Sequence, residues 1–325
     1  MRTFISLIAL IAIAPSCGDP KAATAGNATK AAPPLIAVIR AADWMGKEWA
    51  EDAIRVGLLE SDMERDRDYR IEVTSAQGDL TALPSLIDRA VDQKAAVIVA
   101  LQRARSTPVV FHLLSDPFAA GAGTSDSDHL PNVTGVYSPG FGDPEQVRRV
   151  ELIRSVVPKA RRVGVLFSPD EGLSVSFKDR FAAAAQQRGL VVTAVPVSAV
   201  GEVGSATQSL CGKVDALELF GNVAHAGFPS LIKVAQGCRI PVFSPSPFEV
   251  MQGATLSFFP DFQEGGVEAG KMIARVLRGE RPAAIPFHRL EKTRVIVNPG
   301  EASKLGVVIP PDVIRKADSV VGAGK

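Results

Sequence analysis

The sequence predicts an α/β protein made of two lobes, each built on a mainly parallel β-sheet. Three observations lead to this prediction. The chain has 325 residues, which is near the upper limit for a single hydrophobic core, so two lobes of roughly 100–200 residues each are expected. Short β-branched apolar runs alternate with longer amphipathic segments, as in βαβ units. This alternation occurs twice along the chain, which predicts two Rossmann-like lobes.

Composition excludes two classes of protein. With 22% charged and 46% hydrophobic residues, the chain has the composition of a folded protein and not of a disordered one. Thirty-six Lys and Arg stand against 35 Asp and Glu, a net charge of +1. Because binding to a phosphate backbone needs a surplus of positive charge, we expect no nucleic-acid partner.

The amino terminus has the pattern of a secretory signal peptide. Arg2 precedes an apolar run of eleven residues, 4–14. As a helix this run would span about 16 Å, well short of the ~30 Å hydrocarbon core of a bilayer, so a permanent transmembrane span is disfavoured. We therefore predict that residues 1–16 are removed on export to the periplasm or another extracytoplasmic compartment.

A lipid anchor is expected directly after the signal peptide. Ser16-Cys17-Gly18 resembles the end of a bacterial lipobox, although Ala14 stands where leucine is usual. Residues 17–34 that follow are mostly small and lack apolar periodicity, as in a flexible tether. We predict lipidation at Cys17 and anchoring to a membrane, and the alternative is ordinary secretory cleavage nearby.

The first lobe is expected to comprise residues 35–138 and 262–290. Residues 35–39 form a continuous apolar run, typical of a strand buried on both faces, and apolar residues then recur at helical spacing from 49 to 59. A second helix is expected around 83–91. The further strands predicted for this lobe are residues 70–73, 95–101, 109–114 and 133–136.

The second lobe is expected to comprise residues 139–261 and 291–321. It begins with a helix over 144–157, where a proline suits the first helical turn, and a second helix runs through 177–185. A late helix through 267–276 returns to the first lobe, so the chain crosses between lobes three times, and these crossings form a hinge. The strands predicted here are residues 162–167, 191–197, 216–219, 241–243, 255–259 and 294–297.

Two cysteines remain if Cys17 carries lipid. Cys211 and Cys238 are 27 residues apart and form an even pair in a compartment that permits disulfides. A bridge between them would stabilise the fold by about 3–4 kcal/mol on the chain-entropy account. Both precede predicted strands, so both can lie at the same edge of a parallel sheet. The alternative is a pair of buried free thiols.

Candidate ligand-binding residues follow the predicted strands, because open parallel sheets bind ligands beyond the carboxyl ends of their strands. Two such edges facing one another would enclose a small molecule. Trp44 can form an aromatic wall of the cleft or begin a helix in the core, and Asp116 and Asp261 can bind a ligand amine or cap a turn. The candidates are Asp43, Trp44, Gln102, Asp116, Tyr137, Ser174, Asn222, Ser246 and Asp261.

Signatures of catalysis and of metal binding are missing from the sequence. The four histidines are scattered, and none shows the His-x-x-x-His spacing that places two imidazoles on one helix face. The polar cluster at residues 125–129 lacks the spacing of a calcium loop. We therefore predict a protein that is not an enzyme and that needs no metal and no cofactor.

Eight motifs follow one another along the mature chain: AQGD (76–79), PVVFHLLSDPFAAG (108–121), NVTGV (132–136), RVGVLFSP (162–169), GKVDA (212–216), IPVF (240–243), GKMIARVLRG (270–279) and LGVVIPP (305–311). In sequence and order they resemble the substrate-binding proteins of ATP-binding-cassette (ABC) importers, in particular the tryptophan- and tyrosine-binding members. The resemblance covers about residues 35–321. It implies a type I periplasmic-binding-protein fold with three hinge crossovers and a small-molecule ligand, for which an amino-acid-like molecule is the candidate. It also implies membrane permease subunits as partners of a monomer.

The chain departs from the family pattern at several ligand-facing positions. Residues 102–107 lead directly into Pro108, where the family has a Thr-Pro-Ala loop and a further helix, and Leu173 stands where asparagine is usual. The segments 220–223 and 244–247 also differ from the polar runs expected there. Two hypotheses follow: a solute-binding lipoprotein of an ABC importer, or an extracytoplasmic sensor or scaffold lipoprotein on the same fold without transport function.

Overall fold

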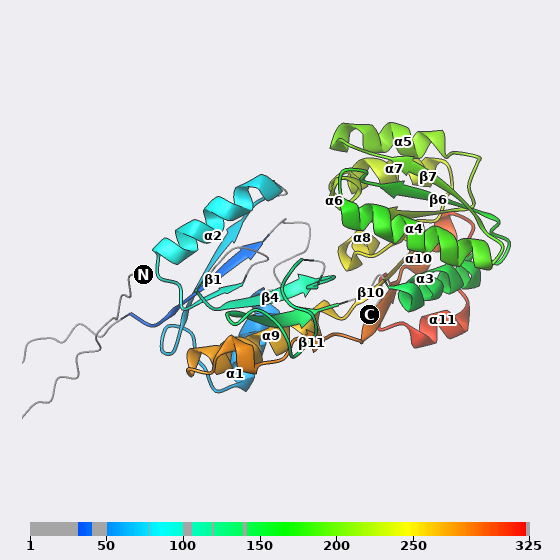
Figure 1. Ribbon diagram of the computed structural model, residues 1–325. Coiled ribbons are helices and arrows are strands. Elements are labelled where there is room, and N and C mark those ends of the chain that lie inside the picture. The colour runs from blue at the N-terminus through cyan, green and yellow to red at the C-terminus, as the bar shows by residue number, and fades with distance from the viewer. Residues whose placement is uncertain are drawn as a thin grey trace, which may run out of the picture. The chain divides into compact units, whose positions relative to one another are not determined.

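Two systems of β-strands organise the computed structural model, which describes residues 32–40, 51–77, 79–99, 106–118, 120–138 and 142–322 (Figure 1). The α/β fold class predicted from the alternation of apolar runs is confirmed. Four predicted site residues lie outside the described residues: Cys17, Asp43, Trp44 and Gln102.

The first lobe is built on a six-stranded parallel sheet. The strand order is β11 (His288–Arg289), β5 (Val133–Tyr137), β4 (Val109–Leu114), β3 (Val97–Val99), β1 (Leu35–Arg40) and β2 (Arg70–Ser75). The successive side chains of β1 alternate between two apolar cores. Ile36 and Val38 face one core, and Leu35 and Ala37 face the other, which explains why the strand reads as a continuous apolar run.

Helices cover both faces of this sheet (Figure 1). Helices α1 (Ala53–Glu60) and α9 (Phe262–Leu277) cover one face, and α2 (Leu83–Asp92), which continues from the 3₁₀ turn η2 (Leu80–Ala82), covers the other. Helices α1 and α9 touch through glycines. A Cβ added to Gly270 would lie 2.9 Å from the Cα of Gly57, so any larger residue at this crossing would force the two helices apart.

The second lobe contains a three-stranded and a four-stranded sheet. The first has the order β7 (Val191–Pro196), β6 (Arg162–Phe167), β8 (Ala216–Phe220), and the second has the order β13 (Ser319–Val320), β12 (Thr293–Val297), β10 (Leu256–Pro260), β9 (Phe243–Ser244). A single parallel bridge between Leu217 and Val242 joins β8 to the start of β9. Among the strands that the structure describes, β10 and β12 pair antiparallel, and the other strand pairs are parallel.

Eight helices described in the second lobe lie on both sides of its strands. In Figure 1, α3 (Asp143–Val156) and α4 (Gly172–Gln187) lie on one side, and α5 (Val203–Ser209) and α7 (Phe228–Gly237) lie on the other. Val150 and Phe181 pack in the first of these layers, and Val203 and Leu231 pack in the second. The remaining helices and 3₁₀ turn of this lobe are α6 (Asn222–Ala226), α8 (Pro247–Met251), α10 (Pro299–Lys304), α11 (Pro311–Lys316) and η3 (Val200–Glu202), while the 3₁₀ turn η4 (Pro282–Ala284) lies beside β5 in the first lobe.

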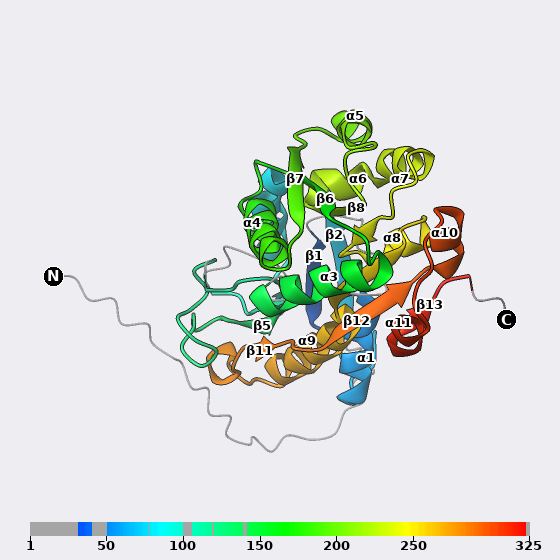
Figure 2. The same cartoon turned by 90° about the vertical axis from the view of Figure 1, so that its right-hand side faces the viewer.

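The chain passes from one strand system to the other three times. It leaves the first sheet after β5, returns after β10 to form α9, and leaves again between β11 and β12. Strand β11 lies beside β5, and β12 beside β13 (Figure 2), while β12 also pairs with β10. The late segments therefore complete both strand systems.

Cys211 and Cys238 form a disulfide, with their Cα atoms 5.5 Å apart. The bridge joins the segment that follows α5 to the residue that ends α7, close to where β8 and β9 begin. No helix among the described residues is long and apolar enough to cross a membrane.

Candidate functional site

The candidate site begins at the carboxyl ends of β6, β8 and β9 in the second lobe. The three loops that follow these strands contain Ser174, Asn222 and Ser246, which are predicted site residues. Parallel strands bring their carboxyl ends to one edge of a sheet, and this edge is called the second-lobe edge below. Each of the three loops is held by hydrogen bonds from its neighbours.

The first contact joins the loop after β6 to the loop after β8. The Oγ atom of Ser174 accepts a hydrogen bond of 2.9 Å from the backbone N–H of Ser168. Gly221 has φ +95°, and a Cβ there would lie 2.7 Å from the Ser174 Oγ. Only glycine combines this backbone conformation with so close an approach. Ser174 is 1% exposed and its oxygen is used inside the lobe.

Glu171 makes a second contact between the same two loops. Its carboxylate accepts the backbone N–H of Asn222 at 2.9 and 3.0 Å and the Asn222 Nδ2 at 3.1 Å. Asn222 is the first residue of α6, so this carboxylate takes one of the amides that a helix start leaves without an intrahelical partner. Both side chains remain partly exposed, which leaves a polar group at the surface of this edge.

A buried network organises the loop after β9. The Oγ of Ser244 donates to the Glu249 Oε2 and accepts the backbone N–H of Ser246 at 2.9 Å. The Nδ1 of His225 lies 2.8 Å from the Glu249 Oε1 and donates to it. All four residues are buried. Because His225 lies on α6 and Glu249 on α8, the network ties together the segments that follow β8 and β9.

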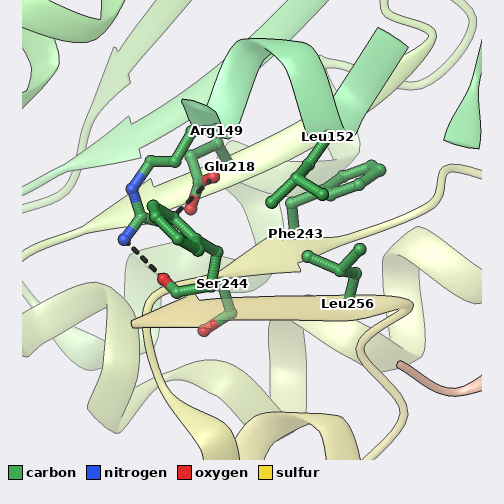
Figure 3. A pocket seen from close by; sticks show the side chains of 7 residues that line it. Arg149, Leu152, Glu218, Phe243, Ser244 and Leu256 are labelled. Atoms are coloured by element: carbon green, nitrogen blue, oxygen red, sulfur yellow. Dashed lines mark hydrogen bonds and ion pairs between the residues drawn. The ribbon is translucent and has the colours of Figure 1, made fainter. Parts of the chain in front are cut away.

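An ion pair lies deeper in the same lobe. Arg149 on α3 is 3.5 Å from Glu218 on β8 and donates to the carbonyl oxygen of Phe258 at 2.7 Å (Figure 3). Burial lowers the pKa of Arg149 and raises the pKa of Glu218, against the attraction between the two charges. The pocket that they line has an empty volume of about 160 Å³, below the ~300–1,000 Å³ typical of ligand sites. We therefore assign this pocket to packing.

The first lobe places Tyr137 and Asp116 near one another at the carboxyl ends of β4 and β5. Tyr137 packs edge-on against Phe118, with ring centroids 5.7 Å apart. Burial, followed by a hydrogen bond to Asp126, raises the pKa of Tyr137 to about 12. Asp116 is exposed, and its Oδ1 accepts the backbone N–H of Phe118 at 3.0 Å. Asp116 therefore caps the turn after β4, as one of its two interpretations expects.

A charged pair lies at the end of β1 in the same lobe. Arg40, the last residue of the strand, has its Nε 3.5 Å from the Glu51 Oε1. Its side chain is 24% exposed. A guanidinium therefore lies at the carboxyl edge of the first-lobe sheet, called the first-lobe edge below.

Asp261 lies where the chain leaves β10 for α9. Its Oδ1 accepts the backbone N–H of Glu264 at 3.2 Å and caps α9. The Asp261 Oδ2 lies 2.7 Å from the Arg294 Nε and 3.2 Å from the Lys292 Nζ. Burial raises the pKa of Asp261, but Arg294, the Glu264 amide and Lys292 outweigh it and hold this pKa below its ordinary value. The structure thus assigns this carboxylate to capping and ion pairing.

The structure brings some predicted site residues together and separates others. Ser174, Asn222 and Ser246 share the second-lobe edge, while Asp116 and Tyr137 belong to the first lobe and Asp261 to a crossover. The sequence prediction omitted Arg40, Glu171, His225 and Glu249. Arg40 and Glu171 could have been found, because Arg40 ends β1 and Glu171 lies in the segment that follows β6. His225 and Glu249 are 24 residues apart, and no local sequence pattern indicates that they pair.

Metal ligands do not gather in this part of the molecule. Across the described ranges, no group of three or more His, Cys, Asp or Glu side chains is placed to hold a metal ion. The chemistry available is that of hydroxyl, amide, carboxylate and guanidinium groups.

Comparison with known proteins identifies the family. The family of ABC transporter substrate binding proteins matches residues 36–321. A tyrosine-binding protein of Clostridioides difficile is 27% identical over 254 residues, which are 75% of this chain and 72% of the relative. The ABC domain in complex with L-Trp from Streptococcus pneumonia superposes with a TM-score of 0.78 at 26% identity, covering 89% of this chain and all of that one.

A conserved domain protein of Vibrio cholerae superposes with a TM-score of 0.77 at 24% identity, over 88% of this chain and 99% of that one. This second structure supports the fold alone. An ABC transporter solute binding protein from Bacillus halodurans with bound myo-inositol shares the fold at a TM-score of 0.58 and 10% identity, over 83% of this chain and 96% of that one. The type I periplasmic-binding-protein fold expected from the sequence resemblance is confirmed. The chain belongs to the ABC transporter substrate-binding protein family.

Proposed function

We propose that the chain is an extracytoplasmic solute-binding lipoprotein of an ABC importer. In this role it captures a small amino-acid-like molecule between its two lobes and delivers it to permease subunits in the membrane. Support comes from family membership and from 26–27% identity to relatives described as bound to L-Trp and as tyrosine-binding.

The observation that carries the proposal is the pair of opposite charges at the two carboxyl edges. Arg40 lies at the first-lobe edge, and Glu171 with Asn222 lies at the second-lobe edge. A free amino acid carries a carboxylate and an ammonium, and each costs several kcal/mol to bury without a partner. The guanidinium would pair with the ligand carboxylate, and Glu171 with Asn222 would accept from the ammonium.

The rest of the ligand would meet a more apolar surface. Leu173, in the first turn of α4, follows Glu171 by two residues and is 49% exposed. An exposed leucine at a binding edge favours a ligand with an apolar or aromatic side chain. Asp43, Trp44, Gln102, Asp116 and Tyr137 are proposed as the contribution of the first lobe.

The lipid anchor completes the proposed role. Removal of residues 1–16 would leave Cys17 as the lipidated first residue, and residues 17–34 would form the tether. A flexible tether of this length has a root-mean-square span of about 20–25 Å, which keeps the folded part close to a membrane permease while it still turns freely.

A thermal-shift screen of the mature chain tests the proposal. The panel would hold L-tryptophan, L-tyrosine, the other amino acids, nucleosides, small amides and lipids. A ligand at 100 times its Kd stabilises the folded state by about 2.7 kcal/mol, which raises Tm measurably. We expect a shift with at least one amino acid, and this shift should shrink in both Arg40→Gln and Glu171→Gln.

The alternative is a sensor or scaffold lipoprotein on the same fold without transport function. Two observations favour it: residues 102–107 lead directly into Pro108, and Ser174, Ser246 and Asp261 are at most 1% exposed. Side chains that are buried and already bonded offer little to a solute. An unchanged Tm with every member of the panel would support this alternative over solute capture.

A further inference from the structure

The buried network at the second-lobe edge consists of Ser244, Ser246, Glu249 and His225. It links two loops that carry proposed ligand residues, Asn222 at the start of α6 and Ser246 before α8. The link runs from the Ser246 N–H to the Ser244 Oγ, then to the Glu249 carboxylate, and from there to the His225 Nδ1.

Glu249 is the residue through which this link passes. One carboxylate oxygen accepts from His225 at 2.8 Å and the other accepts from the Ser244 hydroxyl, so the two oxygens serve two different segments. Glu249 is 4% exposed, and His225 is 7% exposed. A carboxylate this buried is not accessible to a ligand. It stabilises the structure through the hydrogen bonds that it accepts from the protein.

The loop after β6 joins the same assembly from the other side. Glu171 accepts from Asn222, and Asn222 lies three residues before His225 on α6. Helix α6 has five residues and is too short to hold its own place by helical hydrogen bonding. Besides the packing of Ala224 in the core, Glu171 at its start and Glu249 near its end fix its position.

Preformed loops favour binding, because the ordering of loops and side chains when a ligand binds lowers the affinity. When the groups of a site are already in place, less binding free energy is spent on reorganisation, because the hydrogen bonds of the site need no rearrangement. The described loops of the second-lobe edge are bonded to one another in this way through protein groups alone.

We propose that Glu249 and His225 form a positioning pair, which sets the placement of Asn222 and Ser246 for the solute without touching it. The inference rests on the proposed function and adds to it the residues that act behind the binding surface. It predicts that affinity depends on side chains that the solute never reaches.

The binding test compares four variants of the mature chain by isothermal titration with L-tryptophan and L-tyrosine. Glu249→Gln and His225→Ala should each weaken binding by about tenfold or more, the equivalent of one lost hydrogen bond to a charged group. His225→Asn should stay within about threefold of the unmodified chain, because the asparagine Nδ2 can donate from near the position of the imidazole Nδ1. Ser244→Ala removes only the link to Ser246. It replaces Glu249→Gln in the binding test if Glu249→Gln does not fold.

The matched control is Asp215→Asn at the opposite edge of the same lobe. The Asp215 carboxylate accepts the backbone amides of Arg161 and Arg162 at 2.8 and 2.9 Å and pairs with the Arg162 side chain. This variant should lower Tm but leave affinity unchanged. Equal affinity in Glu249→Gln, His225→Ala and the unmodified chain would overturn the inference, as would an affinity loss in Asp215→Asn as large as theirs.

Hydrogen exchange separates failure of this inference from failure of the proposed function. If no member of the thermal-shift panel binds the unmodified chain, the proposed function loses its support, and the link is judged from exchange alone. Glu249→Gln should then speed amide exchange both in residues 222–226 and in residues 244–247. Faster exchange in only one of these two segments would show that Glu249 does not connect them.

Discussion

The Nε of Arg294 lies 2.7 Å from the carboxylate of Asp261, and this ion pair joins two of the three places where the chain passes between the strand systems. Asp261 lies in the passage from β10 to α9, and Arg294 lies on β12, which follows the last passage. Asp261 also caps α9. One carboxylate thus ties the start of a helix to a strand of the second lobe.

Replacement of Asp261 by alanine should destabilise the chain by about 2–4 kcal/mol, because it removes a helix cap worth about 1 kcal/mol and leaves Arg294 without its partner. Urea denaturation at pH 7 measures the loss. Asp261→Asn keeps a capping oxygen and should lose less. If the two variants were equally stable, the cap would contribute nothing measurable.

The same carboxylate predicts a dependence on pH. The pKa of Asp261 is held below its ordinary value in the folded chain, so its stabilising effect is complete above the ordinary value of about 3.9 and is lost as pH falls through the lower folded value. The difference in unfolding free energy between the unmodified chain and Asp261→Asn should therefore narrow on acidification below about pH 4. A constant difference down to pH 2 would contradict the assignment.

Replacement of Ser174 by alanine should reduce stability as well as any ligand affinity. The Ser174 Oγ accepts the Ser168 N–H in a buried position, and a buried donor that loses its acceptor costs about 1–3 kcal/mol. Denaturant unfolding compared with Ser230→Ala, an exposed serine on α7 of the same lobe, measures this cost. Equal stability of the two variants would show that the Ser168 amide finds another acceptor.

Tyr137 should resist ionisation at alkaline pH. Its pKa is raised to about 12, and burial also raises the pKa of Tyr69, the other tyrosine of the chain. A phenol whose folded pKa is raised stabilises the fold fully below its ordinary value of about 10, and this contribution is lost as pH rises through the folded value. Ultraviolet titration of the Tyr69→Phe variant should show little phenolate at pH 10.5 until urea unfolds it.

Leu173 should influence which solute is preferred and have little effect on stability. Its side chain is 49% exposed, and exposed substitutions away from special features usually change stability by less than about 0.5 kcal/mol. Under the proposed function, Leu173→Asn should weaken binding of aromatic amino acids by a few-fold, about 1 kcal/mol of lost apolar contact. Isothermal titration with L-tryptophan and L-serine gives the comparison, and equal changes for both would exclude selective contact with the apolar side chain.

Most of the strands could be predicted because their residues carry a local signal. Residues 162–167 were predicted as a strand and form β6 with the same bounds, and the helix predicted at 144–157 is α3 at Asp143–Val156. Helices α6 and α8 were not predicted, because five residues are too few for an apolar repeat to show. The antiparallel pairing of β10 with β12 was also not predicted, because a whole helix separates the two strands in the sequence.

The candidate site could also be predicted only in part from the sequence. Asn222 and Ser246 were predicted from the general rule that ligands meet the carboxyl ends of parallel strands, a rule that needs only the order of the elements. Whether a side chain at such an end is open to a solute depends on neighbours from elsewhere in the chain. Ser174 and Asp261 were candidates by position, but both are buried and bonded within the protein.

Taken alone, the sequence determined the alternation of strands and helices, the family and the edges where polar residues gather, because these depend on periodicity and order along the chain. The tertiary structure decided how the polar side chains pair: His225 with Glu249, Glu171 with Asn222, and Asp261 with Arg294. The physical reason is that a hydrogen bond or an ion pair depends on distances of about 3 Å between atoms, and residues 24 to 51 positions apart reach such distances only when the fold brings their segments together.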